Sequence, residues 1–212
     1  MAGAVVLDFE GFLPGQIIDD EYSSMGIHIS AINLGGGPNI AAVFDTNNFT
    51  GGDSDLAAPF INNNGLGSLS PGNVLILQEN DNCDSVLCDT PDDEGSRPAG
   101  YFTLEFDVPV TLNSIDFFDI EMAESPQTSE NQISLYGVDG LITNAFWTPD
   151  TGGNNTWAQL AFGISGITKI EIRMGGSGAI DNIDVTPIPV PAAGWLFASG
   201  LFGLIAACRR RR

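Results

Sequence analysis

The chain has 212 residues and a formal net charge of −20, a length that suits one domain and an appendage. Four of its seven Lys and Arg residues are Arg209, Arg210, Arg211 and Arg212 at the C-terminus. The remaining body is so acidic that nucleic acid would repel it, which excludes nucleic-acid binding. A hydrophobic content of 43%, with 13 Phe and 3 Trp, excludes a disordered chain.

Short apolar runs separated by Gly, Asn, Asp and Pro predict about ten β-strands. Two runs alternate cleanly: "YFTLEFD" (101–107) places Phe102, Leu104 and Phe106 on one face, and "ITKIEIRM" (167–174) repeats the pattern. The predicted strands are 4–9, 26–32, 40–44, 73–78, 101–107, 114–122, 132–137, 157–163, 167–174 and 179–185. This arrangement predicts an all-β fold over residues 1–186, an antiparallel, jelly-roll-like β-sandwich.

The run "SIDFFDIEM" (114–122) changes its apolar phase in the middle. Phe117 belongs to one face, whereas Phe118, Ile120 and Met122 belong to the other. A β-bulge between Phe117 and Phe118 would keep both sets buried, and we predict one there.

Two long connections, 45–72 and 79–100, carry most of the carboxylates of interest. Asp53 and Asp55 lie in the first connection, and Asp92 and Asp93 lie in the second. Oxygen-rich loops suit Ca²⁺, which takes six to eight oxygen ligands in a flexible geometry. The alternative is a solvated acidic surface that keeps the protein soluble.

Asp181 in "AIDNIDV" shares its strand parity with apolar residues, so we predict that it points inward. A carboxylate among aliphatic side chains must be protonated, hydrogen-bonded or bound to a cation. Glu10 lies at the end of the first strand, where it could meet the last one. We therefore expect a structural Ca²⁺ site that uses Glu10 and Asp181 and is completed by loop oxygens. The alternative is the opposite parity, with Ile180 inside and Asp181 in water.

The pair Cys83 and Cys88 in "CDSVLC" lacks the spacing and the histidines of a zinc site. In an exported protein it predicts a small loop closed by a disulfide. The alternative is two unpaired thiols.

Catalytic motifs are missing from the sequence. The only histidine, His28, lies between Ile27 and Ile29 in an alternating strand and is predicted to point outward. No nucleophile elbow and no phosphate-binding glycine motif is present. We therefore expect no enzyme, and keep as the alternative a secreted carbohydrate-active hydrolase that uses the loop carboxylates.

Trp147 and Trp157 flank a polar loop, "TPDTGGNNT". Aromatic rings beside Asn and Asp side chains are typical of a sugar-binding surface. The two tryptophans are therefore candidate glycan contacts, and the alternative is that they are part of the core.

The last segment, 187–212, is chemically unlike the body. Prolines in 187–191 predict an extended spacer. The uncharged run 192–208 has the minimum length, about 17 residues, of a membrane-spanning helix. The arginine cluster 209–212 follows, and by the positive-inside rule it stays cytoplasmic while the body lies outside the inner membrane.

This tail resembles the PEP-CTERM sorting signal of Gram-negative bacteria. The stretch "IPVPAAGWLFASGL" has Val190 between Pro189 and Pro191, followed by Ala192 and Trp195, and is similar to the VPLPA-type variant. The body motifs "LDFEG", "TGGDSDL", "GNVLILQEN", "PDDEG" and "GGSGAIDNIDV" are similar to secreted domains of that group.

The resemblance implies a protein that an exosortase-type enzyme processes at the inner membrane. The body motifs imply an exported β-sandwich domain. Together with the carboxylates and tryptophans described above, this leads us to expect a Ca²⁺-stabilised binding or adhesion module of the cell surface or extracellular matrix, with polysaccharide as a candidate partner. The start "MAGAVVLDFEG" has no apolar run of a signal peptide before the first strand. We therefore expect that the true start of the protein lies upstream or that this chain is a fragment.

Overall fold

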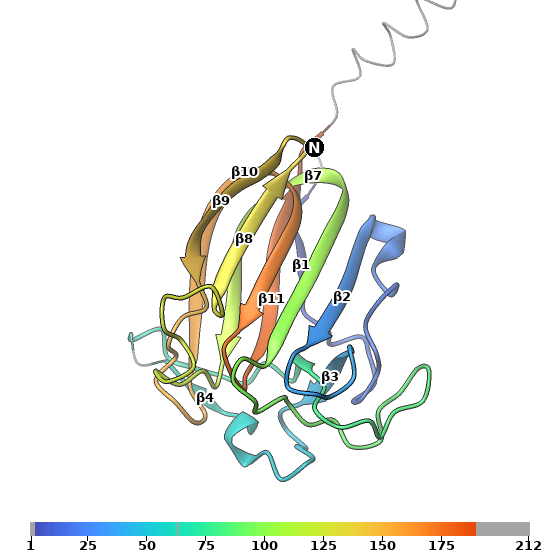
Figure 1. The fold of residues 1–212 in the computed structure, drawn as a ribbon, viewed down its shortest axis with the longest axis vertical. Helices are drawn as coiled ribbons and strands as arrows, with labels where there is room; N and C mark the ends of the chain where they lie inside the picture. Colours follow the sequence, from blue (N-terminus) through green and yellow to red (C-terminus); the bar gives the residue numbers. More distant parts are fainter. Residues whose placement is uncertain (1–2, 63, 190–212) are drawn as a thin grey trace, which may run out of the picture.

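A computed structural model describes residues 3–62 and 64–189, and these residues form an all-β fold on one antiparallel sheet (Figure 1). The strand order is β3-β6-β11-β7-β10-β8-β9, with β1 paired to β11 and β2 paired to β7. The strands are β1 (Val5–Leu7), β2 (Ile27–Asn33), β3 (Ala41–Asp45), β6 (Asn73–Leu77), β7 (Gly100–Phe118), β8 (Gln132–Gly137), β9 (Gly140–Trp147), β10 (Trp157–Met174) and β11 (Ala179–Pro187). A separate pair is formed by β4 (Phe60–Ile61) and β5 (Ser68–Leu69), and two short 3₁₀ turns are η1 (Ser23–Met25) and η2 (Ser54–Leu56).

Two long strands, β7 and β10, run through both layers of the fold. The first half of β7 pairs with β2 and with the second half of β10, whereas its second half pairs with β11 and with the first half of β10. Between these halves the register of β10 shifts, and Gly163 and Gly166 have the positive φ angles of 66° and 85°. Irregularities of this kind bend strands, and the sheet therefore folds over on itself in a sandwich-like arrangement.

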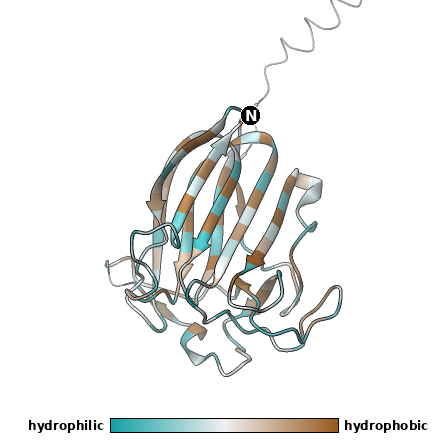
Figure 2. Ribbon diagram, viewed as in Figure 1, coloured by the Kyte–Doolittle hydropathy of each residue, from teal (hydrophilic) through white to brown (hydrophobic). Residues whose placement is uncertain are grey.

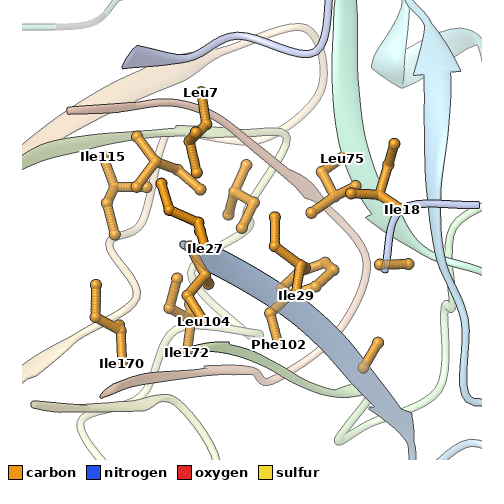
Figure 3. Close-up of a cluster of buried hydrophobic side chains, with 14 of the residues drawn as sticks. Leu7, Ile18, Ile27, Ile29, Leu75, Phe102, Leu104, Ile115, Ile170 and Ile172 are labelled. Atoms are coloured by element: carbon orange, nitrogen blue, oxygen red, sulfur yellow. The ribbon is translucent and has the colours of Figure 1, made fainter. Parts of the chain in front are cut away.

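The main hydrophobic core lies between these two parts of the sheet. It receives Ile27 and Ile29 from β2, Phe102 and Leu104 from β7, and Leu75 from β6, all of them buried (Figure 3). Figure 2 shows hydrophobic and hydrophilic bands that alternate along the strands, as expected when one face of a strand is buried. The alternation predicted for 101–107 and 167–174 is confirmed.

A second hydrophobic core lies under the two long connections. The strand residues Phe44, Ile76 and Phe118 meet Leu56 and Phe60, which come from the first connection. Strands β3 and β6 are consequently buried on both faces for most of their length. The connections are thus packed onto the sheet, and they gather at its lower end in Figure 1.

The structure corrects three expectations about the strands. No register shift separates Phe117 from Phe118: both pair regularly with β10 and β11 and are buried on opposite faces, because each face has its own core. Met122, placed inside by the sequence pattern, is 77% exposed. The predicted strands 101–107 and 114–122 belong to the single strand β7, which ends at Phe118, so residues 119–122 are not part of a strand. The predicted strands 157–163 and 167–174 are both part of β10. Strand β9 was not predicted.

The predicted membrane-spanning helix 192–208 and the arginine cluster 209–212 lie outside the described residues. Within 3–62 and 64–189, no helix has the length and apolar character needed to cross a membrane.

Candidate functional site

Three carboxylates from the two long connections meet one another. One oxygen of each of Asp53, Asp92 and Asp93 lies within 4.8 Å of those of the other two. Asp53 precedes the turn η2, and Asp92 and Asp93 lie some 40 residues later in the second connection. We call these three residues the loop acidic cluster.

Backbone contacts hold the second connection in place at this cluster. The Glu79 amide donates to the Asp92 carbonyl (2.9 Å), and the Thr50 hydroxyl donates to the Pro91 carbonyl (2.6 Å), which joins the two connections. The Gly178 amide, just before β11, donates to Asp93 Oδ2. Gly51 permits the close approach, because a Cβ there would lie 2.3 Å from Asp92 Oδ1 and its φ is 67°.

Two further carboxylates flank the cluster. Asp55 lies two residues after Asp53 in the turn η2, and Asp119 follows the last residue of β7 with a left-handed φ of 58°. Asp119 is buried, and its Oδ1 accepts the Asn155 amide (3.2 Å). Sequence reasoning missed Asp119, although an Asp directly after an apolar strand run tolerates the left-handed backbone that turns a side chain toward a site.

Asn155 links these flanking residues to each other. Its amide nitrogen also donates to the Asp55 carbonyl (2.9 Å), and its Nδ2 donates to the carbonyls of Ser54 (3.0 Å) and Ala57 (2.7 Å). The connection between β9 and β10 is thereby fastened to the turn that carries Asp53. Three segments distant in sequence are held together around the cluster.

Burial and mutual repulsion determine the acidity of these groups. Burial, followed by the nearby carboxylates, raises the pKa of Asp53. Burial raises the pKa of Asp93, although hydrogen bonds from Asp53 and Gly178 oppose the shift. Burial, together with the charge of Asp55, raises the pKa of Asp119 to about 8. Ionising the cluster is therefore costly unless a positive charge is supplied.

The basic side chains of the described chain do not supply that charge. Arg97 pairs with Glu124 (2.9 Å), Lys169 lies over the Tyr136 ring (4.1 Å), and Arg173 pairs with Glu171 (2.8 Å). Each of these three side chains thus interacts with a partner outside the loop acidic cluster.

Asp181 and Glu10 are not members of the loop acidic cluster. Asp181 is only 1% exposed, and it lies directly opposite Asp116, which is 4% exposed, on the neighbouring strand β7. Its neighbour Ile180 is also fully buried, because both faces of β11 are covered at this point. Burial, with the charges of Asp116, Glu10 and Asp8, raises the pKa of Asp181 to about 9. The structure therefore divides the six predicted metal ligands between two places.

The two candidate glycan contacts also lie in different surroundings. Trp157 belongs to the second core, is 8% exposed and donates from Nε1 to the Gly67 carbonyl (3.2 Å). Trp147, at the end of β9, lines a cavity of about 480 Å³. Other residues that line this cavity are Phe146, Leu160, Ser125, Gln127 and Asp150. Trp147 alone is thus placed where a ligand could reach it.

Cys83 and Cys88 form a disulfide, and Cys88 is buried in the second core. Pro189, the first residue of the predicted sorting motif, is exposed just beyond β11. The other motif residues lie outside the described part of the chain.

The chain matches no protein-family model, and no curated protein matches it significantly.

Proposed function

We propose that this chain is an exported binding or adhesion module of the cell surface or extracellular matrix, stabilised by Ca²⁺ at the loop acidic cluster. The observation that carries the proposal is the convergence of Asp53, Asp92 and Asp93 from two long connections. Flexible loops that supply several carboxylate oxygens suit Ca²⁺. In this proposal the sandwich-like body is jelly-roll-like and serves as the scaffold of a binding surface.

Charge and burial support a cation at this place. Asp93 is 6% exposed and Asp53 Oδ2 is buried without a hydrogen-bond partner among the described residues. Asp119 and Asp55 add two further carboxyl groups beside the cluster, and Asp119 would ionise when a cation binds. A divalent ion would neutralise these groups and hold the two connections together, which links Ca²⁺ to the stability of the surface they form.

Thermal melting with Ca²⁺ or EDTA tests the proposal. Ca²⁺ at about 100 times its Kd should raise the Tm by roughly 5 to 10 °C. The substitution Asp53→Asn should reduce this rise, whereas Asp139→Asn, at an exposed turn between β8 and β9, should leave it intact. An equal rise in the Asp53→Asn variant and the unsubstituted chain would exclude the loop acidic cluster as the site.

We further propose that the tail 187–212 delivers the body. Its Pro-rich motif, uncharged run and arginine cluster support transient anchoring in the inner membrane, with the body outside, followed by processing by an exosortase-type enzyme. Mass spectrometry of the mature C-terminus in the native host tests this. A C-terminus near Pro191 is expected, and a surface-located protein that still ends at Arg212 would contradict processing.

Polysaccharide is the ligand class that we propose for the module, with the cavity beside Trp147 as its contact. An aromatic ring next to amide, hydroxyl and carboxylate groups can stack on a sugar and bind its hydroxyls. Affinity electrophoresis in gels that contain soluble neutral β-glucans, α-glucans or mannans measures binding. Trp147→Ala should abolish the retardation, whereas Leu141→Ala, at a 53% exposed position of the same strand, should preserve it. A Trp147→Ala variant retarded as strongly as the unsubstituted chain would exclude this cavity.

The second candidate is a secreted hydrolase that uses the loop carboxylates. The spacing within the loop acidic cluster, up to 4.8 Å, is near the separation of about 5 Å between the two carboxyl groups of retaining glycosidases. Assays of sugar release separate the two functions. Asp53→Asn and Asp92→Asn would abolish turnover in a hydrolase, and would only lower stability or adhesion in a binding module.

A further inference from the structure

Strand β11 exchanges its partner in the middle of its length. Ala179 and Ile180 pair with β6, whereas Ile183, Asp184 and Val185 pair with β1. Between them, Asp181 and Asn182 have no strand partner on that edge within the described residues. Asn182 has a left-handed φ of 48°, and the register with β7 shifts after Asp181. The exchange point is thus a local break in an otherwise continuous sheet.

Two buried carboxylates face each other across the strands at this break. Asp116 is well satisfied: its Oδ1 accepts Gln159 Nε2 (2.9 Å) and its Oδ2 accepts Asn182 Nδ2 (3.1 Å). Asp181 accepts only the Asn182 amide, and its Oδ1 is buried with no hydrogen-bond partner among the described residues. The two neighbours therefore differ, because both oxygens of Asp116 are paired and Asp181 retains a bare buried oxygen.

Two exposed carboxylates lie in the turn that follows β1, and the pairing of Leu7 with Ile183 brings this turn next to the break. Asp8 and Glu10 are exposed, and their charges act on Asp181. Glu10 is held in position, because its Oε1 accepts the Asn73 amide (2.8 Å) at the start of β6. Asn73 Nδ2 in turn donates to the carbonyls of Phe9 and Phe12, both at 3.1 Å. The turn after β1 is thereby fixed beside the break.

We propose that the carboxylates of Asp181 and Glu10 bind a second cation of the Ca²⁺ type at the break between β1 and β6, and that Asp8 and Asp116 supply further negative charge around it; these four residues are the junction acidic group. Among the described residues no three of these carboxylates meet as closely as those of the loop acidic cluster, so the ion would have to draw Asp181 and Glu10 together. Asp181 Oδ1 and the Glu10 carboxylate are its principal ligands. A hard divalent cation takes oxygen ligands of this kind, and the exposed Asp8 and Glu10 give it a path of entry. This site is independent of the loop acidic cluster, so the chain would hold two ions.

A cation accounts for the surroundings better than a proton or a salt bridge. A proton on Asp181 would neutralise one of the four carboxylates, whereas a divalent ion neutralises two and bonds the bare oxygen directly. Within residues 3–62 and 64–189, Arg97, Lys169 and Arg173 are engaged elsewhere, so none of them forms a salt bridge with Asp181. The bound ion would connect β1, the start of β6 and β11, and so close the gap in the sheet.

Native mass spectrometry of the full chain titrated with Ca²⁺ tests the inference by stoichiometry. The unsubstituted chain should bind two ions. Asp181→Asn should bind one, Asp53→Asn should bind one, and the exposed control Asp139→Asn should bind two. Because Asn mimics a protonated Asp in shape, an Asp181→Asn variant that still binds two ions would overturn the inference.

The variant Glu10→Gln provides a second test of the junction site in case Asp181→Asn does not fold. Glu10 is exposed, and Gln retains the oxygen that accepts the Asn73 amide, so the fold should survive, as near-ultraviolet circular dichroism can verify. Its second Ca²⁺ should bind at least about tenfold more weakly, since a charged ligand is lost. Unchanged affinity of both ions in Glu10→Gln would also count against the inference.

The same titration separates this inference from the proposed function. A single ion that is lost only in Asp53→Asn overturns the junction site and leaves the loop acidic cluster in place. A single ion that is lost only in Asp181→Asn supports the junction site and overturns the loop acidic cluster. No bound Ca²⁺ in the unsubstituted chain overturns both.

Discussion

Phe117 and Phe118 are consecutive residues of β7, and each is fully buried in a different hydrophobic core. Successive side chains of a strand point to opposite faces, so Phe117 enters the core inside the sandwich and Phe118 enters the core beneath the long connections. Phe118 meets Phe60 of the first connection edge to face, with ring centroids 4.8 Å apart. The strand β7 thereby couples the sandwich to the loops that carry the loop acidic cluster.

This arrangement predicts different consequences for two adjacent substitutions. Phe117→Ala and Phe118→Ala should each lower the free energy of unfolding by about 3 to 5 kcal/mol, because each removes a fully buried ring. Only Phe118→Ala should also weaken Ca²⁺ binding at the loop acidic cluster, since it loosens the connections. Urea unfolding and calcium titration measure the two effects. Equal losses of Ca²⁺ affinity in both variants would contradict the separation of the two cores.

The strands were predictable where apolar and polar residues alternate and one face of the strand is exposed to solvent. The sequence run 101–107 identified its buried face correctly, because Phe102, Leu104 and Phe106 are separated by polar residues. The prediction failed at 114–122, because a strand that is buried on both faces has no alternation of apolar and polar residues. A bulge was therefore invoked where a second core exists. The strand β9 was missed because Leu141 and Ile142 are apolar although they are exposed, so its sequence does not alternate between apolar and polar residues.

The candidate sites were predictable only in part, for a related reason. The burial predicted for Asp181 is confirmed, but strand parity does not explain it. Its neighbour Ile180 lies in the main core together with Ile183 and Val185, because the register shifts after Asp181 and both faces of β11 are covered. Its buried neighbour Asp116 lies 65 residues earlier and meets it only through the pairing of β7 with β11. Asp119 likewise reaches the loop acidic cluster through the end of β7. Contacts made by strand register between distant segments leave no local pattern in the sequence.

The raised pKa values predict how stability depends on pH. Asp181 at about 9 and Asp119 at about 8 bind protons more tightly in the folded chain than in the unfolded one, where an Asp titrates near pH 4. Between about pH 4 and 9 the folded state therefore holds more protons, so stability is highest at the acidic end and falls as pH rises.

In EDTA the Tm should fall by about 13 to 25 °C between pH 6 and 9. The fall reports the buried carboxyl groups of Asp181 and Asp119, whose pKa values lie in this interval. Saturating Ca²⁺ should reduce the fall in Tm, because the bound ion neutralises the buried carboxylates in place of protons. Differential scanning calorimetry at matched ionic strength measures both slopes, and a Tm that rises over this interval in EDTA would contradict the prediction.

The disulfide of Cys83 and Cys88 should contribute modestly to stability. It closes a short loop, for which chain entropy predicts about 2 kcal/mol. Because Cys88 is packed in the second core, the double variant Cys83→Ser/Cys88→Ala keeps a small apolar group there and avoids a buried hydroxyl. Its Tm should be lower by about 4 to 8 °C. Treatment of the unsubstituted chain with a reductant should give a similar loss, and a reductant without effect would show that the bond is dispensable.

Asn155 offers the sharpest test of how the connections hold the loop acidic cluster. Its Nδ2 bonds to Ser54 and Ala57, and its φ of 55° is one that Asn adopts more readily than Ala. Asn155→Ala should therefore lower stability by about 1 to 3 kcal/mol and weaken Ca²⁺ binding. Asn155→Gly tolerates the positive φ but lacks the two hydrogen bonds from Nδ2, so it should recover only part of the stability that Asn155→Ala loses.

Asn154→Ala is the matched control, because the Asn154 amide is exposed and makes one long contact of 3.5 Å to Asp55. Limited proteolysis within 45–72 should accelerate in the two Asn155 variants alone, and equal protection in all three would mean that Asn155 does not fasten this connection.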